Sequence, residues 1–180
     1  MRRIHLKRLD CILPVLALLL ALPGCNGAGT GTGQTGSETE AGTSPGPELK
    51  TYSWDEAIVY EAEEGTLRGG TSAKEEGGIG YVEGFSREED ELELAIHIEE
   101  NGFYDLNFVS RSADGGYKEN YVAVDGERMG TAAVEGKEYT DSLISRVYLE
   151  TGDHTVKLSS YWGWIQVDSL KVKPSDELDP

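Results

Sequence analysis

Two glutamates and one distant aspartate are the residues of this chain best suited to bind a cation. Glu61 and Glu63 stand two positions apart in the segment YEAEEG, and Asp168 interrupts the otherwise apolar segment WIQVDSLKV. On a β-strand, residues two apart leave the same face, so these glutamates would repel each other unless a positive charge lay between them. Calcium, which accepts irregular sets of oxygen ligands, would supply that charge. The alternative is that all three carboxylates face solvent.

Three aromatic side chains surround a glycine in the segment SSYWGWIQVD, namely Tyr161, Trp162 and Trp164. Large aromatic groups at a loop have no core to fill, so their exposure needs an explanation. Sugar binding is one, because the apolar face of a sugar ring stacks on an indole while its hydroxyls bind polar neighbours. Trp162 is the better candidate for an exposed platform, whereas Trp164 fits a cap on the core equally well.

A glycine-rich polar segment, RSADGGYKENYVAVDG, offers a second set of sugar-binding candidates. Arg111, Tyr117, Lys118, Glu119 and Asn120 would supply hydrogen-bond donors and acceptors to hydroxyl groups. Taken alone, the same pattern is that of an ordinary polar hairpin.

Short β-strands must position these residues. In ELELAIHIEE, apolar and polar residues alternate, which is typical of a half-buried strand. Asn-Gly and Asp-Gly pairs separate such segments and favour tight hairpin turns. We therefore predict an all-β fold, a β-sandwich of the jelly-roll type. The expected strands are 58–63, 80–85, 91–99, 102–111, 120–124, 143–149, 154–159 and 164–173.

The first residues resemble the export signal of a bacterial lipoprotein. Basic residues precede the apolar run CILPVLALLLAL, which is shorter than the roughly 20 residues that span a bilayer. The sequence LPGC that follows resembles a lipobox, so we expect Cys25 to be lipidated and to anchor the exported chain to the bacterial cell membrane, on its extracytoplasmic side. The expected parts are a signal peptide at 1–24, the lipidated cysteine with a flexible Gly/Ser/Thr-rich linker at 25–50, one domain at 51–174 and a tail at 175–180.

Cysteine content and charge limit the possible partners. The two cysteines are Cys11, inside the signal, and Cys25, so no disulfide is expected in the domain. Four of the 16 basic residues but only one of the 33 acidic residues precede Cys25, which leaves 12 basic and 32 acidic residues after it, a net charge of −20. Such an acidic chain repels phosphate backbones, so nucleic acid is an unsuitable partner. We expect a monomer.

Four segments occur in the order found in a known family. They are VYEAEEGTL, GIGYVEGF, FVSRSADGGYKENYVAVDG and LETGDHTVKLSSYWGWIQVDSLKV. Together they resemble the carbohydrate-binding modules of family 35, and less closely those of the related family 6. The glycine-rich loop and the WGW loop before a VD strand resemble those of the mannan-binding members. Two departures are Asp125, where the family's hairpin has asparagine, and Ser112, where an aromatic residue is common.

The resemblance implies a jelly roll with a structural calcium ion held by residues that match Glu61, Glu63 and Asp168. It implies that Trp162 or Trp164 stacks on sugar. It also matches Tyr81 and Asn120 to residues of the family's binding site.

Non-catalytic binding of a polysaccharide, a β-mannan or a related plant polymer, is therefore the expected function. The alternatives are a structural or protein-interaction lipoprotein that binds no sugar, and a catalytic role in a glycoside hydrolase system. Hydrolysis would need two carboxylates about 5–10 Å apart across a scissile bond. His97 and His154 are dispersed, and we interpret both as surface residues.

Overall fold

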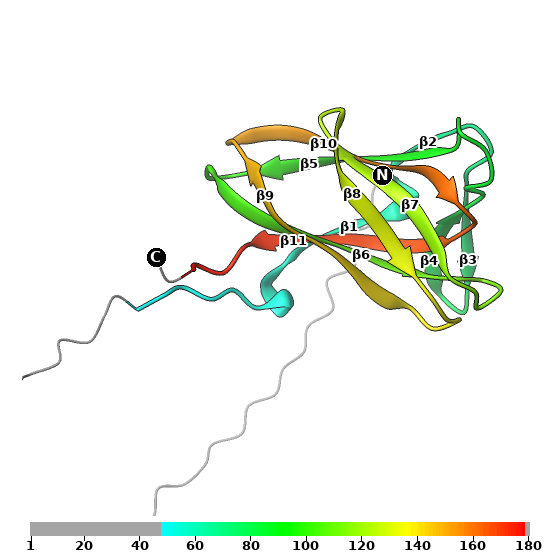
Figure 1. Ribbon diagram of the computed structural model, residues 1–180, viewed down its shortest axis with the longest axis horizontal. Helices are drawn as coiled ribbons and strands as arrows, with labels where there is room; N and C mark the ends of the chain where they lie inside the picture. Colours follow the sequence, from blue (N-terminus) through cyan, green and yellow to red (C-terminus); the bar gives the residue numbers. More distant parts are fainter. Residues whose placement is uncertain (1–47, 179–180) are drawn as a thin grey trace, which may run out of the picture. The chain divides into compact units, whose positions relative to one another are not determined.

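The computed structural model describes residues 48–178, which form two stacked antiparallel β-sheets (Figure 1). One sheet has the strand order β3-β4-β11-β6-β9, with β1 also paired to β11, and the other has the order β2-β5-β10-β7-β8. The predicted β-sandwich is thereby confirmed.

The predicted signal peptide, the linker up to residue 47 and Cys25 lie outside the described residues. The strands are β1 (Ile58–Glu61), β2 (Thr66–Arg68), β3 (Ser72–Glu76), β4 (Ile79–Glu83), β5 (Glu91–Ile98), β6 (Gly102–Arg111), β7 (Lys118–Val124), β8 (Glu127–Val134), β9 (Thr140–Leu149), β10 (Gly152–Trp162) and β11 (Gln166–Pro174).

The core lies between the sheets and consists of the inward residues of alternating strands. In β5, Leu92, Leu94, Ile96 and Ile98 are buried, as the period-two pattern predicts. Aromatic rings at the centre, Phe85 and Phe108, are fully buried. This packing holds the strand ends, and therefore the loops between them, in place.

Three strands have no counterpart in the sequence prediction: β2, β3 and β8. All three lie at the edges of their sheets, and β3 and β8, with the sequences SAKEE and ERMGTAAV, are rich in charged or small residues. A strand that packs on one side at an edge need not show the apolar alternation that identifies inner strands. The last strand also begins at Gln166, so Trp164 lies in the preceding loop.

The predicted strand over 58–63 is shorter than expected. β1 ends at Glu61, and Ala62–Glu64 form a 3₁₀ turn whose first residue is fully buried. Burial of Ala62 bends the chain inward, so Glu61 and Glu63 do not leave one strand face. The premise that placed their carboxylates side by side on a strand is therefore wrong, and any convergence must come from the turn.

A buried carboxylate, that of Asp90, organises the segment before β5. Its Oδ1 accepts the N–H of Gly70 at 2.5 Å, and its Oδ2 accepts those of Ser86 at 2.9 Å and Arg87 at 2.7 Å. These bonds, the one from Gly70 first, lower the pKa of Asp90 from 3.8 to about 2. Gly69 has a φ of 68°, and a Cβ there would clash with Asp90 Oδ1, so glycine is required for the close approach.

Both ends of the described chain are bonded at one end of the sandwich. The N–H of Glu177 donates to the carbonyl of Lys50 at 2.9 Å, and the N–H of Ser175 donates to the carbonyl of Phe103 at 2.8 Å. Hydrogen bonding to the sandwich thus continues past the end of β11. Between residues 48 and 178 the structure contains no helix long and apolar enough to cross a membrane.

Candidate functional site

The WGW loop joins β10 to β11 and presents two tryptophans to solvent. Trp162 is 65% exposed and Trp164 is 62% exposed, whereas the next residue, Ile165, is buried in the core. The core therefore ends at Ile165, and neither indole fills it. The alternative in which Trp164 caps the core does not apply.

Side chains from β7 hold this loop from beneath. The amide oxygen of Asn120 accepts the N–H of Tyr161 at 3.1 Å, and its Nδ2 donates to the carbonyl of Gly163 at 3.4 Å. Lys118 lies against Gly163, whose φ of 92° favours glycine. Asp114 in turn accepts a bond from Lys118 Nζ at 2.8 Å, which holds the pKa of Asp114 well below its ordinary value. The loop conformation is thus set before any ligand arrives.

Two adjoining hollows form an open groove beside Trp164. The first, about 350 Å³, is mostly apolar and lies between Trp164, Gln166, Ala113 and Glu83. The second, about 310 Å³, is lined by Tyr81, Arg111, Glu76 and Lys137, and it shares Ala113 and Gln166 with the first. Volumes of this size are typical of small-ligand sites. The groove thus continues from an indole face to a polar floor.

Hydrogen bonds join four polar side chains across the strands of this floor. Arg111 donates through Nε to Gln166 Oε1 at 2.8 Å and through Nη2 to Glu76. Gln166 donates to Glu83 Oε2 at 2.9 Å. The guanidinium of Arg111 also lies over Tyr139, 4.8 Å from the ring centroid, and 5.7 Å from that of Tyr81. The polar groups are therefore fixed in orientation, which lowers the entropic cost of binding a ligand.

The structure divides the predicted sugar-binding residues into three groups. Trp164, Tyr81 and Arg111 meet at the groove. Asn120, which is fully buried, and Lys118 support the WGW loop, whereas Trp162 on that loop and Tyr117 before β7 are exposed. Direct sugar contact by any of them stays a prediction. Sequence reasoning missed groove residues on three strands, namely Glu76, Glu83 and Gln166, and two in loops, Ala113 and Lys137.

The candidate cation ligands gather where β1 meets β11. Glu61 pairs with Ser169, so it lies next to Asp168, and Ser169 donates to Asp168 Oδ2 at 2.9 Å. Partial burial, and after it the negative charges of Asp168 and Glu63, raise the pKa of Glu61 above its ordinary value. Within residues 48–178, no ion pair joins a lysine or arginine to Glu61, Glu63 or Asp168. These carboxylates thus repel one another without a protein cation to offset the repulsion.

The donor chemistry of this acidic group suits calcium, although its side chains are not arranged as a coordination sphere. The carboxylate of Glu63 occupies space that a side chain at residue 80 would fill, since a Cβ on Gly80 would clash with Glu63 Oε1. In the described part of the chain, no group of three or more His, Cys, Asp or Glu side chains is placed to hold a metal ion. Binding would therefore require these side chains to move together.

Both histidines of the described domain are hydrogen-bonded to an aspartate. His97 Nδ1 lies 2.7 Å from Asp153. His154 bridges Asp125 at 2.6 Å and the carbonyl of Glu150 at 2.8 Å, and the bond to Asp125 raises the pKa of His154 above 6.5. The His154 side chain is only 13% exposed, so its role is to tie two turns together rather than to lie free on the surface.

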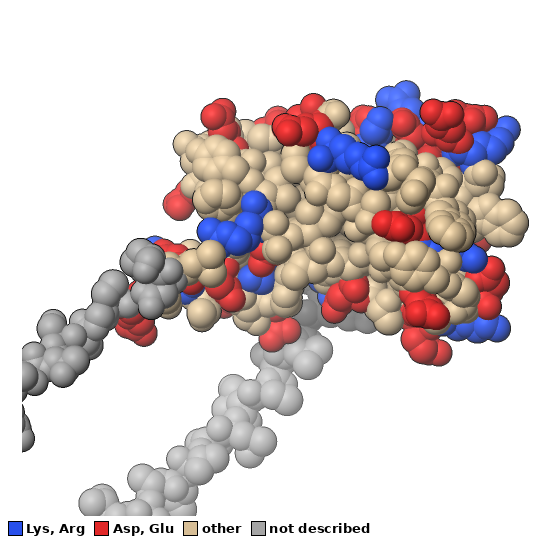
Figure 2. Space-filling view, in the orientation of Figure 1, with Lys and Arg blue, Asp and Glu red and all other residues tan. Residues whose placement is uncertain are grey.

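Charged groups are unevenly spread over the domain. Figure 2 shows neutral side chains across the middle of one face, with acidic groups mostly towards its ends and rim. The full chain carries a formal net charge of −17. Such a surface suits an uncharged ligand better than an anionic one.

Comparison with known families assigns most of the described domain to one family. The model of the carbohydrate-binding module family 35 matches residues 58–175. The chain belongs to this family. The matched range includes the acidic group and every residue that lines the groove.

Related proteins carry this module as one part of a longer chain. Mannan endo-1,4-beta-mannosidase B of Piromyces sp is 32% identical over 120 residues, which are 64% of this chain and 21% of that protein. The crystal structure of the Podospora anserina GH26-CBM35 beta-(1,4)-mannanase is similar with a TM-score of 0.61 and 28% identity, over 69% of this chain and 29% of that one. A CBM36 module solved with calcium and xylotriose shares the fold, with a TM-score of 0.54 and 21% identity over 64% of this chain and 99% of that one. The chain thus spans only about a fifth to a third of the two mannan-degrading proteins.

Proposed function

We propose that this family 35 module binds a β-mannan or a related plant polysaccharide without cleaving it. The observation that carries the proposal is the groove in which the exposed indole of Trp164 adjoins the fixed polar side chains of Gln166 and Arg111. An indole takes the C–H face of a sugar ring, and the polar side chains take its hydroxyls. The two relatives that act on mannan support mannan as the polymer.

The carboxylates of the groove support binding rather than hydrolysis. Glu76 accepts a bond from Arg111, and Glu83 accepts one from Gln166. A glycosidase needs one carboxyl group protonated to act as an acid and a second one free to act as a base or nucleophile. Carboxylates held by donors at the groove floor are suited to orient hydroxyl groups instead.

Retardation of the full chain in native gels that contain polysaccharide tests this function. We expect retardation by β-mannan or galactomannan, and no release of reducing sugar from the same polymers. A chain that migrates identically with and without mannan, galactan and uronic-acid polymers would instead support the protein-interaction alternative. Release of reducing sugar would support the catalytic one.

Calcium at the acidic group is the second part of the proposal. Glu61, Glu63 and Asp168 would hold the ion, which would neutralise their repulsion and tie β1 to β11. The calcium in the CBM36 structure supports such an ion in this fold. An ion that binds only the folded state stabilises it by about 2.7 kcal/mol at 100 times its dissociation constant.

Replacing Glu61 by glutamine is expected to change stability in opposite directions with and without calcium. In chelator, Glu61→Gln removes a carboxylate whose pKa is raised by burial and by its neighbours, so the melting temperature should rise. In millimolar calcium the same variant loses a ligand, so its melting temperature should fall below that of wild type. Thermal unfolding in both buffers measures this, with Glu88→Gln, an exposed acid, as control. A rise in both buffers would contradict a calcium site.

The location of the module is the third part of the proposal. We propose export and lipidation at Cys25, supported by the basic and apolar residues that precede LPGC. Mass spectrometry of the membrane-bound chain, which should begin with an acylated Cys25, tests this.

A further inference from the structure

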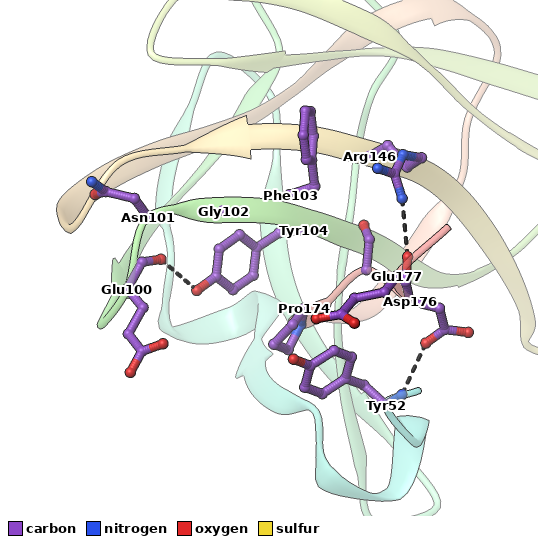
Figure 3. Close-up of a pocket in the computed structure, with 11 residues that line it drawn as sticks. Tyr52, Glu100, Asn101, Gly102, Phe103, Tyr104, Arg146, Pro174, Asp176 and Glu177 are labelled. Carbon is purple, nitrogen blue, oxygen red and sulfur yellow. Dashed lines mark hydrogen bonds between the residues drawn. The ribbon is translucent and has the colours of Figure 1, made fainter. Parts of the chain in front are cut away.

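A separate hollow, outside the groove, lies at the opposite end of the sandwich. It has a volume of about 250 Å³ and lies where the two ends of the described chain meet (Figure 3). The rings of Tyr52, Phe103 and Tyr104 border it, together with Arg146 and Glu177. Strand β6 runs from this hollow, at Gly102, to the groove, at Arg111, and its ten residues span about 30 Å.

The backbone of β9 is distorted so that Arg146 reaches this hollow. The pairing of β6 with β9 shifts register between Tyr104 and Leu106. Arg146 has a φ of 59°, a left-handed conformation that is unfavourable for arginine. The carboxylate of Asp105 accepts the N–H of Arg146 at 3.1 Å, and the carbonyl of Asp176 accepts its Nη1 at 3.0 Å. Bulges of this kind redirect side chains, and strained residues persist where the surrounding structure holds them, often at ligand sites.

Arg146 and the aromatic rings form a surface of mixed character. The guanidinium lies over Phe103, 4.8 Å from the ring centroid. Among the described residues its one hydrogen bond is that to Asp176, so further N–H groups remain for a ligand. Tyr104 also borders a neighbouring, mostly apolar hollow of about 260 Å³. This neighbour shares Glu100 and Pro174 with the hollow beside Arg146. A ligand can therefore extend across the Tyr104 ring.

The charges around the hollow determine what it can hold. Glu100, Asp176 and Glu177 line it and would repel an anion, whereas Arg146 would repel an ammonium group. A neutral ligand with neighbouring hydroxyls suits both the carboxylates and the guanidinium, because a hydroxyl can donate to a carboxylate and accept from the guanidinium. Aromatic borders add an apolar contact for the C–H face of such a ligand.

We propose that this hollow is a second saccharide-binding site, built by Arg146, Phe103, Tyr52 and Tyr104. It takes one or two sugar rings of a neutral glycan. This second site rests on the proposed function only for the class of its ligand, a saccharide. Its geometry is independent, because it shares no residue with the groove. With sites at two ends, one module holds two separate glycan segments, which raises the avidity for a polymer.

Isothermal titration of the full chain with mannotriose tests the second site, because a trisaccharide is too short to bridge both ends. We expect two molecules bound per wild-type chain. We expect one in Trp162→Ala/Trp164→Ala, and a further loss of at least tenfold in affinity when Arg146→Gly is added. Glycine accepts the φ of 59°, so the melting temperature should stay close to that of wild type.

Two variants keep this result interpretable. Arg146→Asn also tolerates the left-handed conformation, and it should lose binding as Arg146→Gly does. Arg128→Ala removes another arginine stacked on an aromatic ring, that of Tyr121, and should leave both binding events unchanged. One bound molecule in wild type and none in the tryptophan double variant would overturn the second site but not the groove. No binding to wild type would overturn both, and unchanged titration of Arg146→Gly would overturn the second site alone.

Discussion

Truncating Trp164 to alanine is expected to weaken binding of β-mannan by about 30-fold or more, with little change in stability. Removing a binding hot spot costs at least about 2 kcal/mol, which corresponds to that factor. Trp164 is 62% exposed, so the free energy of unfolding should remain within about 0.5 kcal/mol of wild type. A buried tryptophan would cost about 3–5 kcal/mol. Gel retardation and thermal unfolding of the same preparation measure both quantities.

Two further tryptophan variants locate the platform. Trp162 is equally exposed but does not border the groove, so Trp162→Ala should weaken binding less than Trp164→Ala. Trp54→Ala makes the same truncation at the other end of the domain, where the ring lies 5.0 Å from Lys173 Nζ, and should leave binding at the groove unchanged. If Trp162→Ala abolishes binding and Trp164→Ala does not, the sugar lies outside the groove beside Trp164.

The sequence predicts the core strands well because each carries its own periodic signal. Leu92, Leu94, Ile96 and Ile98 alternate with polar residues whatever lies beside them, and all four are buried. The strand β3, SAKEE, lacks this signal because it pairs with β4 alone at the edge of its sheet. Its position depends on the backbone of β4 rather than on its own apolar side chains.

The groove is harder to predict because its residues come from four strands and from loops between strands. Trp164 is recognisable in the sequence as an aromatic residue without a core position. Glu76 and Gln166 have no such mark, and they belong to the site because β3, β4, β11 and β6 bring them to Arg111. The same applies to Asp90, whose sequence neighbours, REEDE, are typical of a solvated acidic segment. Its burial depends on glycines 20 residues earlier.

Replacing Asp90 by alanine is expected to destabilise the domain strongly, and more than the substitutions proposed above at other charged residues. The variant leaves the N–H groups of Gly70, Ser86 and Arg87 without their acceptor in a site where Asp90 itself is fully buried. Losing the charged acceptor of three backbone donors in a part-buried site is among the causes of large destabilisation by a single substitution. We expect the melting temperature to fall by about 10 °C or more, measured by thermal unfolding at neutral pH.

The pH dependence distinguishes the charge of Asp90 from its shape. Hydrogen bonds lower the pKa of this carboxyl from 3.8 to about 2 in the folded domain. The stability that its charge contributes is therefore complete above about pH 4 and is lost as the pH falls towards 2. The difference in melting temperature between wild type and Asp90→Asn should accordingly be constant from pH 5 to 7 and shrink below pH 4. Glu89→Ala, the adjacent exposed acid, is the matched control and should change the melting temperature little. A difference that persists undiminished at pH 2.5 would mean that the carboxylate charge does not hold these loops together.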